Sequence, residues 1–172
     1  MEIIHPISPV PLPLWGANLR KIMKQSEWKK LRKNLIEERG MKCETCGKAI
    51  EKSGGIKAHE DWTYEISKSP AIAHLTKITL SCWHCHSIEH FGATKNMVAS
   101  GELSQQAIDD TIAHFCELNK STVTEFHQHH DEVFERWDKM NKLEWVVDWG
   151  PFGDWVAVTF QGDPMAAPRR LV

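Results

Sequence analysis

Apolar residues recur every three or four positions in three stretches of the chain, a spacing that gathers them on one face of a helix. The first stretch begins at Ser26, a residue type that caps helix N-termini, and ends before Gly40. The second covers 104–119, and the third opens at Ser121 or Thr122 and continues to about residue 140. The pattern therefore predicts three amphipathic helices.

The other patterned segments are short, and they alternate apolar with polar residues as half-buried strands do. Segments 143–149 and 154–160 both alternate, and the Gly-Pro-Phe-Gly sequence at 150–153 between them is typical of a turn. Together they predict a small β-hairpin near the C-terminal end. Segment 5–16 holds four prolines, which remove backbone donors and disfavour helix, so we expect it to be extended.

Size and composition indicate a globular protein of about one domain. The chain has 172 residues, of which 41% are hydrophobic and 26% are charged. No apolar run reaches the roughly 18 residues that a membrane-spanning helix needs, and the N-terminus lacks the pattern of a signal peptide. We therefore expect a cytoplasmic protein, in whose reducing surroundings the five cysteines indicate metal binding rather than disulfides.

Charge is distributed unevenly, although the formal net charge is only −2. Residues 19–42 carry nine basic and three acidic side chains, whereas 101–163 carry four basic and thirteen acidic ones. This separation indicates that the basic end faces a polyanion, or that the two ends attract each other within the fold. On the first interpretation, four side chains of the first helix contact DNA phosphates: Lys29, Lys30, Arg32 and Lys33.

Four of the five cysteines form two Cys-x2-Cys pairs, Cys43 with Cys46 and Cys82 with Cys85. Each pair can present two thiolates to one ion, and two pairs complete the tetrahedral four-sulfur site that zinc prefers. Gly47 suits the tight turn that follows the first pair. Because four protein ligands leave no open coordination position, we expect this zinc to be structural.

Histidines are concentrated around the second cysteine pair. His86 and His90 are four residues apart, so a helix that begins near Trp83 places both on one face, where they can bind one ion. Upstream, a short strand is predicted to end in the pair His59-Glu60, and segment 77–81 is predicted to be the return strand. Two strands and a helix held together by zinc make an α+β core of the ββα type.

These motifs resemble the HNH (ββα-metal) family of endonucleases in its four-cysteine form. The resemblance rests on CETCG at 43–47, AHEDW at 58–62 and LTKITLSCWHCHSIEHFG at 75–92, and it covers roughly residues 40–92. The flanking sequences PLWGANLRKIMKQSEWKKLR and EWVVDW are similar to a subgroup of small bacterial and phage HNH proteins.

The resemblance implies an α+β fold in three parts. A zinc-stabilised ββα-metal core occupies 43–100. An extended Pro-rich segment and the basic helix precede it at 1–42. An acidic extension, made of a helical pair and the small hairpin, follows it at 101–172.

The resemblance implies one of two assignments at the end of the first strand. If Ala58-His59 matches the family's paired residues, His59 is the general base that activates water. If His59-Glu60 matches them, His59 binds the catalytic ion together with His86 and His90, and Glu60 becomes the base or an orienting residue. We prefer the second assignment, because Ala58 has no atom that can coordinate a metal.

One position departs from the family pattern. Lys77 stands where the family has an asparagine that orients the base, and an ammonium group cannot accept a hydrogen bond. Lys77 could instead contact a phosphate of the DNA, or the nearby His74 could supply the lost orientation. The departure bears on catalysis rather than on the fold.

The resemblance implies a metal-dependent endonuclease, a hydrolase of phosphodiester bonds, with double-stranded DNA as its partner. Its cofactors would be a structural Zn²⁺ and a catalytic divalent ion (Mg²⁺, Mn²⁺, Ni²⁺ or Zn²⁺), among which histidine ligands disfavour Mg²⁺. The alternative is a catalytically inactive, zinc-stabilised nucleic-acid- or protein-binding module on the same scaffold.

Overall fold

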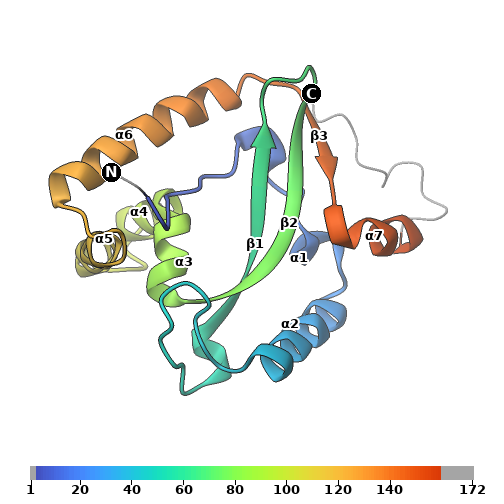
Figure 1. Cartoon of the computed structure of the whole chain (residues 1–172), viewed down its shortest axis with the longest axis horizontal. Helices are drawn as coiled ribbons and strands as arrows, with labels where there is room; N and C mark the ends of the chain where they lie inside the picture. The colour runs from blue at the N-terminus through green and yellow to red at the C-terminus, as the bar shows by residue number, and fades with distance from the viewer. Residues whose placement is uncertain (1–2, 160–172) are drawn as a thin grey trace.

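The computed structural model describes residues 3–159, and within them the protein has an α+β fold. A long hairpin of β1 (Ile56–Glu65) and β2 (Ala71–Cys82) runs through the middle of the molecule, as Figure 1 shows. Helices α3 to α6 lie on one side of this hairpin, and α2, α7 and strand β3 lie on the other (Figure 1). The helix bounds are α1 Leu19–Ile22, α2 Gln25–Arg39, α3 Trp83–Glu89, α4 Phe91–Ala99, α5 Gln106–Asn119, α6 Val123–Met140 and α7 Gly153–Thr159, with short 3-10 helices at Leu12–Leu14, Ser53–Gly55 and Gly150–Phe152.

The sheet has the strand order β1-β2-β3. β1 and β2 pair in antiparallel fashion, from Ile56 opposite Cys82 to Glu65 opposite Ile72. Strand β3 (Trp145–Asp148) pairs in parallel with the first residues of β2. β1 is therefore an edge strand, and α3, which follows β2 directly, contacts it.

The predicted C-terminal hairpin is wrong in its second half. Residues 145–148 do form a strand, but that strand pairs with β2, and helix α7 stands where the second strand was expected. Gly150, at φ +49°, packs so closely on β2 that any side chain there would collide with the Leu75 carbonyl. The chain turns away from the sheet at this point, and Val156 of α7 is buried in the core beneath it. Residue 160, the end of the predicted strand, and the rest of the predicted extension up to 172 lie outside the described residues.

The three helices predicted from the apolar spacing are present. α2 starts one residue before Ser26, and its first turn is capped by Glu27, which accepts the N–H of Lys24 at 2.9 Å. α5 starts two residues later than expected. α6 is capped by Thr122 rather than Ser121, because the Thr122 hydroxyl accepts the N–H of Glu125 at 3.2 Å.

The strands around His59 are also present, but both are longer than predicted. β1 continues past Glu60 to Glu65, and β2 begins at Ala71 rather than at residue 77. Segment 5–16 contains neither α-helix nor strand, and its one regular turn is the 3-10 helix Leu12–Leu14. Within residues 3–159, no helix combines the length and apolar character needed to span a membrane.

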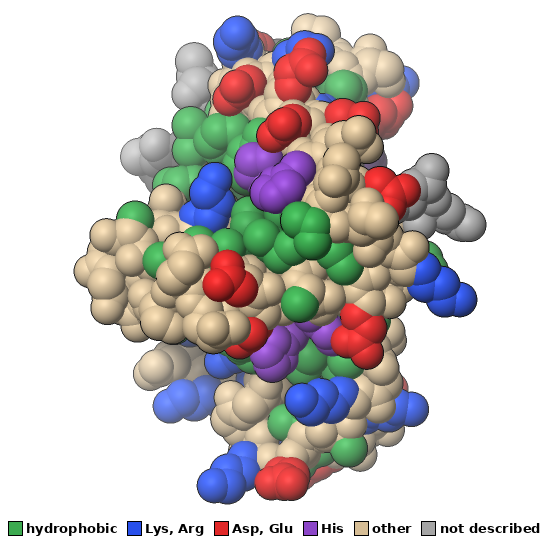
Figure 2. Space-filling view, turned by 90° about the vertical axis from the view of Figure 1, so that its left-hand side faces the viewer, with side chains coloured by type: hydrophobic (Ala, Val, Ile, Leu, Met, Phe, Trp, Pro, Cys, Tyr) green, Lys and Arg blue, Asp and Glu red, His purple; other side chains and the backbone are tan. Residues whose placement is uncertain are grey.

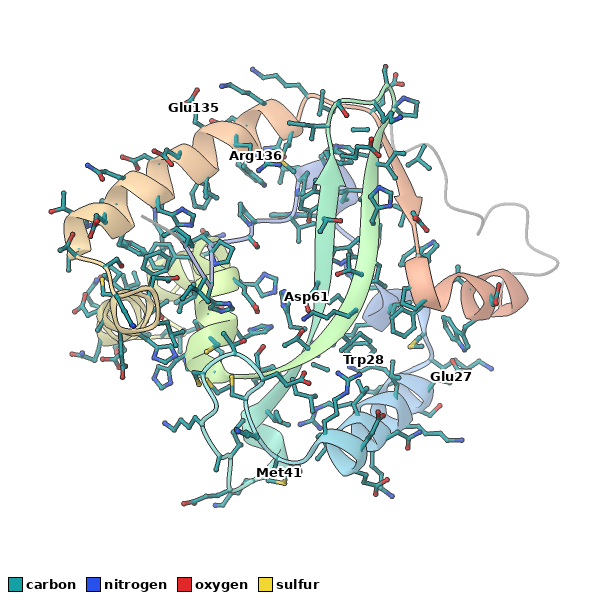
Figure 3. All side chains as sticks on the ribbon, in the orientation of Figure 1. Glu27, Trp28, Met41, Asp61, Glu135 and Arg136 are labelled. Carbon is teal, nitrogen blue, oxygen red and sulfur yellow. The ribbon has the colours of Figure 1, made fainter. Side chains whose placement is uncertain are left out.

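Two clusters of buried apolar side chains hold these elements together. The larger packs the sheet against α1, α2 and α7 through residues such as Leu19, Leu35, Leu80 and Trp145. In α2, Trp28 packs against this cluster while its neighbour Glu27 points outward, as Figure 3 shows. The smaller cluster joins the N-terminal segment to α3–α6 through Ile7, Ile88, Phe91, Phe115 and Phe126. On the face formed by these helices, hydrophobic side chains lie between two groups of histidines (Figure 2).

Candidate metal centres and the pockets beside them

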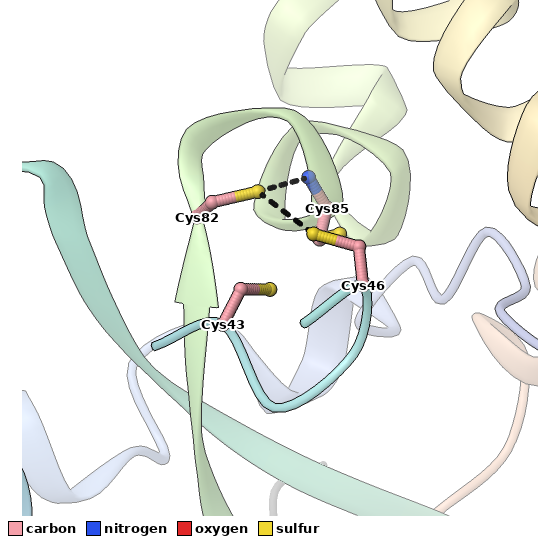
Figure 4. A group of neighbouring side chains, drawn as sticks. All are labelled: Cys43, Cys46, Cys82 and Cys85. Atoms are coloured by element: carbon pink, nitrogen blue, oxygen red, sulfur yellow. Dashed lines mark hydrogen bonds between the residues drawn. The ribbon is translucent and has the colours of Figure 1, made fainter. Parts of the chain in front are cut away.

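The four cysteines of the two Cys-x2-Cys pairs come together in one cluster, shown in Figure 4. Cys43 and Cys46 lie in the loop before β1, and Cys82 and Cys85 lie where β2 passes into α3. Their sulfur atoms are all within 4.8 Å of one another. The Cys46 and Cys82 sulfurs are 3.8 Å apart, which equals the edge of a tetrahedron with Zn–S bonds of about 2.3 Å. The cluster could therefore hold a structural zinc ion.

The backbone around the cluster favours this arrangement. Gly47 has φ +76°, and its N–H donates to the Cys43 carbonyl at 2.9 Å, which closes the turn of the first pair. Hydrogen bonds from the thiols of Cys82 and Cys85 lower the pKa of Cys43, and the same contacts raise the pKa of Cys82 and of Cys85, so negative charge is favoured on the Cys43 sulfur alone among these three. Cys43 and Cys85 are fully buried. A thiolate in a closed pocket is what a structural zinc site requires.

The second cluster joins histidines from two elements. His59 lies in β1, His86 lies in α3, and His90 stands at the junction of α3 and α4. One ring nitrogen of each lies within 4.8 Å of the others, so the three could hold a metal ion. His90 Nε2 is 3.1 Å from His59 Nδ1, close to the separation of about 3.3 Å between two nitrogens that bind one zinc ion tetrahedrally.

Burial keeps these three imidazoles uncharged. Desolvation, with smaller contributions from neighbouring histidines, lowers the pKa of His59 to about 2. Desolvation likewise lowers the pKa of His86 to about 3, and it lowers the pKa of His90. Only a neutral imidazole has a lone pair for a metal, so the cluster is ready to bind an ion at neutral pH.

Two carboxylates also lie beside His59, and one of them contacts the same ring nitrogen that faces His90. Glu89 Oε2 lies 3.2 Å from His59 Nδ1, and Asp61 Oδ1 lies 3.8 Å from His59 Nε2. Asp61 is labelled in Figure 3 beside β1, and its carboxylate accepts the hydroxyl of Thr79. Desolvation raises the pKa of Glu89 to about 8, and Asp61 adds to the effect. His59, Asp61 and Glu89 form a second group whose donor atoms lie within 4.8 Å of one another.

Glu60 lies beside the histidine cluster but is engaged elsewhere. Its two carboxylate oxygens accept the backbone N–H groups of Leu19 and Arg20, at 3.1 and 3.3 Å. These N–H groups lie in the first turn of α1. Desolvation raises the pKa of Glu60, and these hydrogen bonds oppose the rise. Glu60 therefore ties α1 to β1 while it lines the same pocket as His59.

That pocket gives the histidine cluster access to solvent. It has a volume of about 200 Å³, and His59, His86 and His90 form one wall. Arg20 and Asn18 line it from α1 and its cap, together with the aromatic rings of Trp28 and Trp62. The cysteine cluster does not line this pocket.

The predicted DNA-contacting residues are placed in different settings. Lys29, Lys30 and Lys33 are exposed on α2, and Lys33 pairs with Glu37 one turn on. Arg32 instead binds the backbone carbonyls of Ser53 and Ile56, which anchors the start of β1. Lys77 is exposed on β2 opposite Asp61, and its charge lowers the pKa of Asp61 against the effect of burial.

The basic helix and the acidic helices lie far apart. Figure 1 places α2 at one side of the hairpin and α5 and α6 at the opposite side. The acidic helices α5 and α6 therefore do not pair with α2 and leave its exposed Lys29 and Lys30 to a partner.

Four residues near the clusters were not predicted from the sequence as site residues. Glu89, Asp61 and His5 lie at no ligand spacing from the predicted site, yet His5 is buried with Nε2 3.7 Å from Glu89 Oε1 and 3.1 Å from the Cys85 carbonyl. His114 of α5 places Nε2 3.2 Å from the Cys85 sulfur. For Glu89, the sequence did hold one signal of its position near the histidine cluster, because it directly precedes His90 at the end of a predicted helix.

No protein-family model, curated protein or solved structure matches the chain. The resemblance to HNH endonucleases is thus confined to the motifs at 43–47, 58–62 and 75–92, and the function that it implies stays a prediction. The geometry by itself establishes an α+β protein with four cysteines that could hold zinc.

Proposed function

We propose that this protein is a metal-dependent endonuclease that hydrolyses phosphodiester bonds in DNA, as its resemblance to the HNH family implies. The observation that carries the proposal is the group of three neutral imidazoles, His59, His86 and His90, which line an open pocket beside a closed four-cysteine cluster. Two antiparallel strands followed by a helix supply all three side chains. An open nitrogen-ligand site on a rigid support suits catalysis, whereas a closed sulfur site suits folding.

The proposal gives each residue of the pocket a role. His59, His86 and His90 would hold the divalent ion, which when bound stabilises the negative charge that grows on phosphate oxygens. Arg20, exposed at the same pocket, provides a positive charge for the phosphate that is attacked. Glu60 lines the pocket and has a raised pKa, and a carboxylate of higher pKa is the better acceptor for a proton from water.

The geometry favours the assignment of His59 as a ligand. His59 Nδ1 lies 3.1 Å from His90 Nε2, so both nitrogens can bind one ion. If His59 were the general base, the ion and the proton from water would compete for the lone pair of this nitrogen. Ala58 lines the pocket too but offers no ligand atom. Glu60 is then the candidate base, and it would have to exchange its hydrogen bonds with the N–H groups of Leu19 and Arg20 for one with water.

The same two hydrogen bonds favour the second candidate function. With Glu60 held by α1 and with Lys77 in place of the orienting asparagine, the pocket has no base that is both free and oriented. A zinc-stabilised nucleic-acid- or protein-binding module that does not cleave would have this arrangement. The exposed lysines of α2 serve either function.

Plasmid cleavage in the presence of Mg²⁺, Mn²⁺, Ni²⁺ or Zn²⁺ tests the proposal. We expect the wild-type protein to convert supercoiled plasmid to nicked or linear forms with at least one ion, and we expect His86→Ala to be inactive. His84→Ala is the matched control, because His84 lies on the same helix but its ring faces His114. A wild-type protein that binds DNA but is inactive with all four ions would support the binding module instead.

A further inference from the structure

A second, larger pocket lies directly beside the histidine cluster. Its volume is about 390 Å³, within the range of roughly 300–1,000 Å³ that small-molecule sites occupy. Three aromatic side chains line it, Trp15 from the N-terminal segment and Phe134 and Trp137 from α6. Lys95 and Asn96 of α4 line it as well, and both are exposed.

The aromatic wall is held in place by hydrogen bonds to a single carbonyl. The indole N–H groups of Trp15 and Trp137 both donate to the carbonyl oxygen of Val10, at 3.0 and 2.9 Å. The ring of Phe134 lies 5.9 Å from that of Trp137, centroid to centroid. Gly92 also lines the pocket, where a Cβ would be in van der Waals contact with the ring of Phe134, at 3.4 Å. The pocket is therefore preformed and keeps flat apolar surfaces accessible.

His90 belongs to both pockets. It lines the larger pocket with Val10, and the same two residues line the smaller pocket that contains His59 and His86. A molecule in the larger pocket can therefore continue past His90 to the histidine cluster. Trp15 stands at the rim of this passage with 65% of its surface exposed, which is unusual for so large an apolar side chain.

We propose that the larger pocket binds an unpaired nucleotide of the nucleic-acid strand whose phosphate lies at the histidine cluster. This inference rests on the proposed function and adds the kind of strand that the site takes. Trp15 and Trp137 offer ring faces on which a base can stack, Asn96 offers an amide donor and acceptor, and Lys95 offers a positive charge for a neighbouring phosphate.

The pocket distinguishes single strands from duplex. A base in a duplex has both faces covered by its neighbours, so it cannot stack on a protein ring unless it leaves the helix. Strands with unpaired bases need no such step, and they stack on aromatic side chains with little regard to sequence. The sequence led us to expect double-stranded DNA as the partner. The pocket instead favours DNA that has an unpaired segment at the site.

Fluorescence anisotropy with the full-length protein tests the pocket without requiring cleavage. The probes are a labelled oligothymidine single strand and a labelled, blunt-ended duplex, with no divalent ion added. We expect the single strand to bind more tightly, and we expect Trp15→Ala to weaken its binding by about 5- to 100-fold, the effect of losing one base–aromatic stack. Trp15→Phe, which keeps a ring, should restore most of the affinity.

Leu12→Ala is the matched control, since Leu12 is an exposed apolar residue of the same segment that does not line the pocket. Equal binding of the single strand by Trp15→Ala and wild type would overturn the inference, as would tighter binding of the duplex. If Trp15→Ala weakens oligothymidine binding but the wild-type protein cleaves no plasmid, only the proposed nuclease activity is refuted. If the plasmid is cleaved but Trp15→Ala binds oligothymidine as wild type does, only the proposed role of the pocket is refuted. If an apolar peptide competes with oligothymidine and the single strand shows no dependence on Trp15, the pocket is a protein-binding groove.

Discussion

The four-cysteine cluster and the three-histidine cluster are neighbours on one helix, yet they differ in closure. Cys85 and His86 are adjacent in α3, but the cysteine is fully buried while the histidine lines an open pocket. The cysteine set has four ligands, which leaves a zinc ion no free position, whereas the histidine set has three. The closed cysteine cluster is thus suited to hold β2 and α3 in position. The open histidine cluster is suited to receive a substrate beside these fixed elements.

The two clusters also differ in how they handle charge. In the cysteine cluster, hydrogen bonds from neighbouring thiols lower the pKa of Cys43, whereas contact with Cys43 raises the pKa of Cys82 and of Cys85. The histidine cluster is kept neutral by burial, and the carboxylates of Asp61 and Glu89 lie beside His59 without lining the pocket. One short helix can thus contribute to a closed sulfur cluster and to an open nitrogen cluster when its successive side chains face differently packed surroundings.

The largest effect should follow removal of a cysteine ligand. Cys85→Ser, or Cys43→Ser, should unfold the central region, because binding of a structural zinc contributes about 10–16 kcal/mol, as much as the whole stability of a typical domain. Zinc content and thermal denaturation measure the effect. Cys116→Ser is the control, since Cys116 lies in α5 outside the cluster. A Cys85→Ser protein with one tightly bound zinc and unchanged melting would exclude the structural assignment.

The next effect separates the two assignments of the histidine cluster. If Glu60 is the base, Glu60→Gln should keep the catalytic ion but reduce the cleavage rate by about 10²–10⁴-fold, the usual contribution of a general base. His59→Ala should then weaken binding of the ion, because it removes a ligand. Metal analysis and a nicking assay on both variants decide the matter. Full ion occupancy in an inactive His59→Ala protein would instead make His59 the base.

In both variants of that experiment the cysteine-bound zinc should remain. The two clusters use different atoms, so a change at His59, His86 or His90 should remove at most one ion. Loss of both ions from His90→Ala would show that the clusters are not separate.

A smaller effect is expected at the buried carboxyl beside His59. Glu89→Gln should lower the affinity for the catalytic ion by about 10- to 100-fold, because Glu89 Oε2 lies 3.2 Å from the same His59 Nδ1 that faces His90, where its negative charge attracts the ion. The loss should grow as the pH rises from 7 to 9. The pKa of Glu89 is raised to about 8, so the wild-type carboxyl gains its charge across this range, while glutamine stays neutral.

Titration of Mn²⁺ at several pH values measures the effect of Glu89. Glu44→Gln is the control, because Glu44 is a carboxylate near the cysteine loop that contacts Arg39 and not His59. Equal Mn²⁺ affinities for Glu89→Gln and wild type throughout the range would show that the carboxyl does not support His59.

The smallest effect should come from the exposed lysines of α2. Replacing Lys29, Lys30 and Lys33 by Gln should weaken DNA binding and reduce its salt dependence, since each lost phosphate contact takes about 0.9 from the log–log slope. The affinity is measured over a range of salt concentrations. Lys139→Gln on the distant α6 is the control, because Lys139 pairs with Glu135. An unaltered slope would remove α2 from the DNA-binding surface.

Local patterns were sufficient for the parts of this protein whose contacts are short in sequence. The spacing within each Cys-x2-Cys pair and between His86 and His90 predicted which side chains point the same way, because a knuckle or a helical turn fixes that geometry over a few residues. The three amphipathic helices follow from the same reasoning, since their periodicity is a property of the helix itself.

Tertiary structure alone decided what depends on segments distant in the chain. The strand at 145–148 alternates as a hairpin strand would, but β2 was the edge available to it, and Gly150 then directs the chain into α7. The N-terminal segment brings His5 to Glu89, and Trp15 and Trp137 meet at the Val10 carbonyl across more than a hundred residues of sequence. Such contacts depend on which buried surfaces fit together, and packing between distant segments has no period in the sequence to reveal it.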